Sequence, residues 1–203
     1  MRAFIWGLCG LVLTACSQFS PPTKSLQLVD GTIAAHAPDG YCVDPVVSRA
    51  GDGFAVMAPC SALGSNQQPP DVHAVATVQV GPPQSALVAN DEEAVVSFLA
   101  SEDGAGLLSG SGTAEDIEVL SATHGADTVT IHFSDAGAPP FDGLDQEEWR
   151  SFTDIGGRLV TVSVRGLIRR PLESGAGARM VSRILLGLTN QDENQVDDDI
   201  TES

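Results

Sequence analysis

The sequence predicts an α+β protein in which two main helices pack on one face of an antiparallel sheet. Three observations support this class. Short strand-like segments fill the first half of the chain, a single helical pattern follows them, and further strand-like segments precede an amphipathic helix near the C-terminus. Strands that follow one another in groups pair as hairpins, which is typical of antiparallel α+β folds.

The chain has 203 residues, of which 42% are apolar, enough for a single hydrophobic core. It contains 10 Lys and Arg residues and 27 Asp and Glu residues, so its formal net charge is −17. Nucleic acids bind basic surfaces, and this charge therefore excludes DNA or RNA as the expected partner.

Five short strands are expected in the first half of the chain. Each segment is β-branched or alternates in polarity, and each is bounded by Asp-Gly or Pro pairs that favour turns. The segments are residues 26–29, 32–37, 41–47, 54–58 and 72–80.

One helix is expected from Asn90 to about Ser101. Asn90 and Glu93 have the spacing of a capping box, and Val95, Phe98 and Leu99 would share one face of the helix. The glycine at position 104 is expected to end this helix, and the nearby Gly-x-Gly pattern lacks the preceding strand that a dinucleotide-binding loop requires.

The second half of the chain begins with a predicted hairpin, in which residues 117–122 and 128–133 flank a turn at 124–127. Residues 158–167 alternate most regularly and are expected to form the strongest strand. The last element, at about 174–189, has apolar residues at helical spacing and should pack on the sheet. These apolar residues are Ala178, Val181, Ile184, Leu185 and Leu188.

The final strand and helix resemble those of the Mog1/PsbP-like α+β domains. The resemblance covers about the last third of the chain and rests on the pattern of elements, without a diagnostic motif. It implies an antiparallel sheet with packed helices, and it transfers no functional residue to this chain.

The first residues have the organisation of a secretory leader. Arg2 supplies a positive charge, residues 3–12 are apolar, and small residues precede Cys16. The quartet Leu13-Thr14-Ala15-Cys16 resembles a bacterial lipobox, which implies lipidation of Cys16 and cleavage before it. An ordinary signal peptide cut nearby is the alternative, and an uncleaved anchor would need about 20 apolar residues.

We therefore expect a lipoprotein signal peptide over 1–15, a lipidated tether over 16–25, one α+β domain over 26–189 and a disordered acidic tail over 190–203. The membrane is the expected partner of the lipid on Cys16. Ser17 stands where an inner-membrane retention signal has Asp, so the periplasmic face of the outer membrane is expected in a Gram-negative host.

Two cysteines, Cys42 and Cys60, remain after the leader is removed and Cys16 is lipidated. An even remainder in an exported chain predicts a disulfide. A hairpin turning at Gly51 would place the two cysteines opposite each other. The alternative of a redox pair or metal site lacks the Cys-x-x-Cys spacing that such sites use.

Catalytic motifs are scarce. The four histidines lack the spacing of helical metal ligands, although His124 and His132 would face each other if the hairpin register allowed it. Asp142, Asp145, Glu147 and Glu148 would suit a hard cation in a loop, but a solvated acidic loop or a helix N-terminus is the simpler interpretation. No cofactor is expected.

The chain has one basic cluster, formed by Arg165, Arg169 and Arg170. These residues are candidate contacts for an outside anion or for the acidic tail, and ion pairing with the acidic majority is the alternative. We expect a lipid-anchored envelope protein with a non-catalytic binding or structural role in the periplasm, whose partner is an envelope protein or the cell wall. A periplasmic hydrolase or metal-binding protein, with a site formed only in three dimensions, is the alternative.

Removal of the acidic tail is expected to leave the melting temperature unchanged or slightly raised at low salt. Residues 190–203 carry six carboxylates and only two aliphatic side chains, too little apolar surface to offset the ordering of the backbone. Thermal unfolding of the truncated and full chains measures this effect. A fall of many degrees would mean that the tail is docked on the domain.

Overall fold

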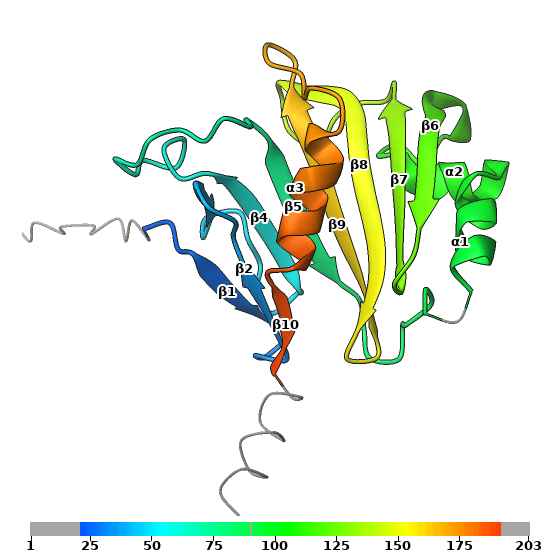
Figure 1. Cartoon of the computed structure of the whole chain (residues 1–203), viewed down its shortest axis with the longest axis horizontal. Helices are drawn as coiled ribbons and strands as arrows, with labels where there is room; N and C mark the ends of the chain where they lie inside the picture. The colour runs from blue at the N-terminus through cyan, green and yellow to red at the C-terminus, as the bar shows by residue number, and fades with distance from the viewer. Residues whose placement is uncertain (1–20, 90, 192–203) are drawn as a thin grey trace, which may run out of the picture.

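A computed structural model describes residues 21–89 and 91–191 of the chain (Figure 1). Seven strands form one antiparallel sheet in the order β3-β4-β5-β9-β8-β7-β6, and three form a smaller sheet in the order β1-β2-β10. The large sheet consists of β3 (Tyr41–Val43), β4 (Phe54–Pro59), β5 (Val75–Val80), β6 (Ile117–His124), β7 (Thr128–Asp135), β8 (Leu144–Ile155) and β9 (Arg158–Leu167). The small sheet consists of β1 (Ser25–Leu28), β2 (Ile33–His36) and β10 (Leu188–Asn190), and the helices are α1 (Glu92–Leu99), α2 (Glu102–Leu108) and α3 (Ala176–Leu185).

The main core lies between the large sheet, the small sheet and α3. Val160, Val162 and Val164 of β9 point into it, because alternate residues of a strand share a face. Trp149 of β8 lies on the same face, where it pairs with Val164. Helix α3 covers this face with Met180, Val181 and Ile184.

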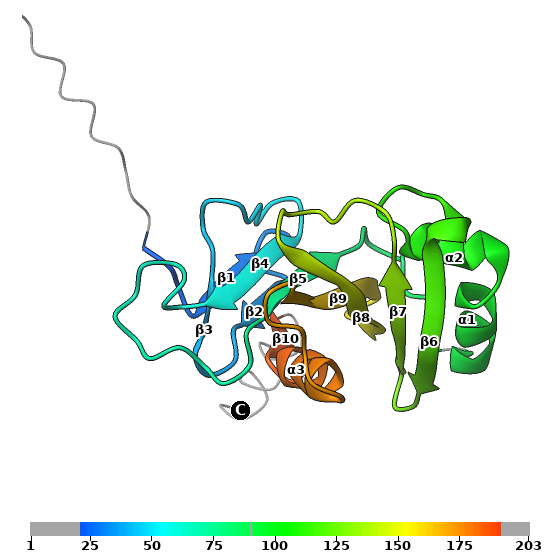
Figure 2. The same ribbon diagram turned by 90° about the horizontal axis from the view of Figure 1, so that it is seen from above.

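A second core lies on the opposite face of the large sheet. There α1 and α2 pack on the odd-numbered residues of β7, which are Val129, Ile131 and Phe133. Phe133 pairs with Glu148, the neighbour of Trp149 along β8, so Phe133 and Trp149 lie on opposite faces. Figure 2 shows α3 beside β8 and β9, and α1 and α2 at the β6–β7 end.

The predicted α+β class with antiparallel pairing is confirmed. The helices are nevertheless distributed over both faces of the large sheet, whereas the sequence predicted two helices on one face. The physical reason is that β7 and β9 present their apolar residues to opposite sides, and each apolar surface has its own helical cover.

Strand β8 was not expected from the sequence. The acidic residues at 142–148 predict a solvated loop or a helix start, yet Leu144–Ile155 forms a strand of twelve residues between β7 and β9. Charged residues at Glu148 and Arg150 interrupt its apolar pattern, and both side chains are paired within the fold.

Helix α2 was not expected either, because Gly104 was predicted to end the preceding helix. The Ser101 hydroxyl instead accepts a hydrogen bond from the Gly104 backbone N–H and caps a new helix. A Cβ atom on Gly104 would overlap the backbone carbonyl of Phe98, so glycine allows this tight junction. Helix α1 is capped by Asp91, whose side chain accepts from the Ala94 N–H at 2.9 Å, while Asn90 lies outside the described residues.

Both ends of the described chain belong to the fold. The Lys24 ammonium donates to the Tyr41 carbonyl at 2.7 Å, so the domain includes residues assigned to the tether. The C-terminal helix ends at Leu185, and residues 188–190 form β10 beside β2. The Gln191 N–H also donates to the Thr32 carbonyl at 2.9 Å, so the truncation that tests the predicted tail begins at residue 192 and not at 190. The remainder of the predicted tail, Cys16 and the predicted leader lie outside the described residues. Within residues 21–89 and 91–191, no helix has the length and apolar character needed to cross a membrane.

Gly177→Ala is expected to destabilise the protein by about 1–3 kcal/mol, because a Cβ atom at this position would overlap the ring of Trp149. The higher helix propensity of Ala, worth about 1 kcal/mol, would offset only part of this cost. Gly106→Ala in α2 is the matched control, since its new Cβ would lie 3.5 Å from the nearest atom outside its helix. Urea unfolding should show a loss of stability for the first variant only.

Candidate functional site

A buried ionic network joins β7, β8 and β9 on the face that α2 covers. Arg165, Glu148 and Asp135 are 5%, 2% and 1% exposed, respectively. The Arg165 Nη2 atom lies 2.6 Å from Glu148 Oε2 and 3.4 Å from Asp135 Oδ2. Arg150 Nε donates to the other oxygen of Glu148 at 2.7 Å.

The remaining polar atoms of this network are bonded within the fold. Asp135 accepts from the Gly110 N–H at 3.0 Å and from the Gly137 N–H at 2.9 Å, and Arg165 Nη1 donates to the Asp145 carbonyl at 3.2 Å. None of the buried side-chain polar atoms in the described part of the chain lacks a hydrogen-bond partner. Arg165 is therefore already neutralised by carboxylates of its own chain.

A small cavity of about 70 Å³ lies over this network. Val75, Phe141 and Leu144 form its apolar wall, and Arg150 and Arg165 contribute to its polar side.

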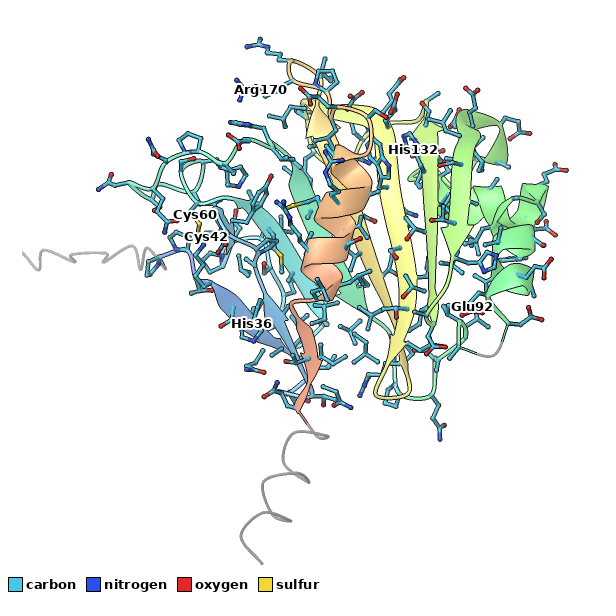
Figure 3. All side chains as sticks on the ribbon, viewed as in Figure 1. His36, Cys42, Cys60, Glu92, His132 and Arg170 are labelled. Carbon is cyan, nitrogen blue, oxygen red and sulfur yellow. A yellow bond between two sulfur atoms is a disulfide. The ribbon has the colours of Figure 1, made fainter. Side chains whose placement is uncertain are left out.

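A larger pocket of about 380 Å³ lies at the N-terminal end of α3, and we call it the Arg170 pocket. Its two arginines and one histidine come from three separate segments of the chain. Its lining consists of Asp71, Val72, His73, Arg170, Pro171, Leu172, Glu173, Ala176 and Arg179. Figure 3 shows Arg170 at the top of the molecule, beside the start of α3.

Arg170 and His73 lie against each other across the pocket. The Arg170 Nη1 atom is 2.8 Å from His73 Nδ1 and 2.7 Å from His73 Nε2. Arg179 extends toward the start of α3, where its Nη1 atom would lie 3.0 Å from a Cβ atom on Gly175. Arg170 and Arg179 form no ion pair with any carboxylate in the described residues.

Hydrogen bonds and close packing fix the two rims of the Arg170 pocket. The buried Tyr41 hydroxyl donates to the Val72 carbonyl at 2.8 Å and accepts from the Ala74 N–H at 3.0 Å. Burial raises the pKa of Tyr41, and the hydrogen bond from Ala74 partly opposes this shift. On the other rim, Leu172 packs closely on Gly166. A Cβ atom added to Gly166 would lie 2.9 Å from the Leu172 nitrogen.

The structure thus separates the three arginines of the predicted basic cluster. Arg165 points into the buried network, Arg170 lines the pocket, and Arg169 is exposed and is not part of the pocket lining. His73 and Arg179 were missed at the sequence level, because no local pattern joins positions so far apart in the chain.

The acidic residues at 142–148 do not converge on one point. Glu148 belongs to the Arg165 network, whereas Glu147 Oε2 lies 3.0 Å from His132 Nε2 on the opposite face of the sheet. His132 also stacks on Trp149, with ring centroids 3.9 Å apart. The described ranges contain no group of three or more His, Cys, Asp or Glu side chains that would hold a metal ion.

His124 and His132 are also apart, because the β6–β7 register pairs His124 with Val129 and His132 with Ser121.

Cys42 and Cys60 form a disulfide in the structure, with their Cα atoms 4.9 Å apart. The hairpin register differs by two residues from the expected pairing of Cys42 with Cys60, because the strands pair about position 50 and not about Gly51. Cys42 pairs with Ala58, and Cys60 lies just beyond the end of β4. The bond therefore links the two strands diagonally, and Figure 3 shows both cysteines at the β3–β4 end of the molecule.

The strands and helices are arranged as in the solved structures of Mog1, and this similarity defines the α+β fold class of the chain. A solved structure of a mutant of protein Mog1 matches with a TM-score of 0.51 and 12% identity, covering 82% of this chain and 95% of that one. The Saccharomyces cerevisiae Ran-binding protein Mog1p matches with a TM-score of 0.50 and 12% identity, covering 84% of this chain and 96% of that one. Cyanobacterial PsbP from Synechocystis gives a TM-score of 0.43 and 13% identity, covering 91% of this chain and 98% of that one.

No protein-family pattern matches the sequence, and no curated protein matches it. At 12% identity, the two Mog1 structures establish a shared fold and no shared activity.

Proposed function

We propose that this chain is a lipid-anchored protein of the bacterial cell envelope with a non-catalytic binding role in the periplasm. The observation that carries the binding role is the Arg170 pocket, where two arginines face solvent without a carboxylate partner among the described residues. The lipobox-like quartet ending at Cys16 supports the anchor, and the Cys42–Cys60 disulfide supports export to an oxidising compartment.

The arginines of the Arg170 pocket support a binding role. The lining of the pocket contains no hydroxyl or thiol side chain, and its other polar groups are Asp71, His73 and Glu173. Guanidinium groups stay protonated and donate hydrogen bonds in a fixed fork, which suits them to hold an anionic group. The proposed partner is therefore an envelope component that presents an anionic group to this pocket.

The anchor is tested with Cys16→Ser. The variant is expected to remain unprocessed or to become soluble, because the thiol is the acceptor of the lipid. Labelling with radioactive palmitate and membrane fractionation measure both effects, and sucrose-gradient separation of the two membranes tests the outer-membrane assignment. A variant with unchanged mass and fractionation would contradict the anchor.

The binding role is tested by co-purification from detergent-solubilised envelope. A partner captured by the natural chain should be lost with Arg170→Gln. It should be retained with Arg49→Gln, which removes the same charge from a side chain that is 61% exposed and paired with Asp52 at a distance from the pocket. If both variants capture the partner as well as the natural chain does, the pocket is not the binding surface.

A further inference from the structure

We propose that the Arg170 pocket binds a phosphate group, an inference that rests on the proposed binding role and specifies its ligand chemistry. Two guanidinium groups that can donate to an anion line the pocket, and His73 lies against one of them. Arg170 comes from the turn after β9, Arg179 from α3, and His73 from the segment before β5.

The pairing of the arginines sets this pocket apart from the buried network. Arg165 has two carboxylates of its own chain within 3.4 Å. Arg170 and Arg179 have no ion-pair partner among the described residues, although Asp71 and Glu173 line the same pocket. In a chain with 27 acidic residues and 10 basic ones, two arginines that line one pocket without an ion pair keep their guanidinium N–H groups available to an outside anion.

The geometry favours a phosphate over a carboxylate. A carboxylate has two oxygens in one plane and matches the fork of a single guanidinium. A phosphate has oxygens directed to several sides, so it can accept from the guanidinium groups of Arg170 and Arg179 together. The N-terminus of α3 adds positive electrostatic potential to the pocket, because the helix begins after Gly175 with no side-chain cap and no acidic residue in its first turn.

The size of the pocket indicates a phosphate carried on a larger molecule. Its volume of about 380 Å³ lies within the range of small-molecule sites, about 300–1,000 Å³. Val72, Pro171, Leu172 and Ala176 provide apolar surface beside the charged groups. A phospholipid headgroup and a free phosphate share this chemistry, and a membrane-anchored chain would encounter both.

The test is calorimetric titration of the full chain, purified in a non-ionic detergent, at constant ionic strength. The probes are inorganic phosphate and dihexanoyl phosphatidylglycerol, with acetate as the carboxylate comparison. We expect one phosphate site per chain that Arg170→Gln and Arg179→Gln each weaken about tenfold or more, since each removes a charge-assisted hydrogen bond. Arg49→Gln should bind as the natural chain does, and thermal unfolding verifies that all variants are folded.

Tighter binding of the lipid identifies a headgroup as the source, tighter binding of inorganic phosphate identifies the free ion, and both uphold the proposal. Acetate binding as tightly as phosphate, or titrations unchanged by both pocket substitutions, would overturn it. Phosphate binding seen only after removal of residues 192–203 would also overturn it, because the pocket would then be a receptor for the acidic tail. If Arg170→Gln abolishes partner capture while phosphate fails to bind, the binding role stands and the phosphate assignment falls.

Discussion

Arg165→Ala is expected to lower the free energy of unfolding by about 3–5 kcal/mol, because it leaves Asp135 and Glu148 buried without their shared counter-ion. The cost comes from desolvated carboxylates that lose their partner, and it therefore exceeds the value of an exposed ion pair, about 0–1 kcal/mol. Arg150 remains on one oxygen of Glu148, but it does not reach Asp135.

Urea denaturation of the natural chain and the variant measures this loss. Arg165→Lys should give an intermediate loss, because it keeps the charge and removes the planar fork that reaches both carboxylates. Arg183→Ala on the exposed side of α3 is the control and should change stability by about 0.5 kcal/mol or less. A loss below 1 kcal/mol for Arg165→Ala would mean that water enters the network and solvates the two carboxylates.

Replacing Cys42 and Cys60 together with Ala is expected to cost about 2–5 kcal/mol. The disulfide closes a loop with a sequence separation of 18, and its removal increases the conformational freedom of the unfolded chain. Both side chains are nearly or fully buried, at 3% and 0% exposure, so the exchange for Ala keeps the site apolar.

Melting curves with and without reducing agent test this contribution. Reduction should lower the melting temperature of the natural chain to near that of the double variant, and it should leave the double variant unchanged. A reductant effect of equal size on both proteins would show that the disulfide is not the cause.

The sequence by itself determined most of the local elements. Strand β9 was predicted with its observed bounds, because Val160, Val162 and Val164 alternate with polar residues over its length. The Cys42–Cys60 pair was predicted by counting cysteines, an argument that needs no coordinates. Alternation and helical spacing depend only on the geometry of a single strand or helix, so a sequence can reveal them.

Interactions between distant segments were decided by the tertiary structure alone. Strand β8 was missed because Glu148 and Arg150 look like surface residues until Arg165 is placed beside them. The face on which each helix packs depends on how β7 and β9 align through β8, which no local pattern encodes.

The Arg170 pocket is also formed by segments that are distant in the sequence. Arg170 was found by its charge, but the sequence grouped it with Arg165, five positions earlier. In the fold, Arg165 lies inside β9 and points into a buried network, whereas Arg170 follows the strand and meets His73, 97 positions away in the chain. The sequence shows which residues are charged. The packing of the sheet determines which of them pair, because ionic contacts form between neighbours in space and not along the chain.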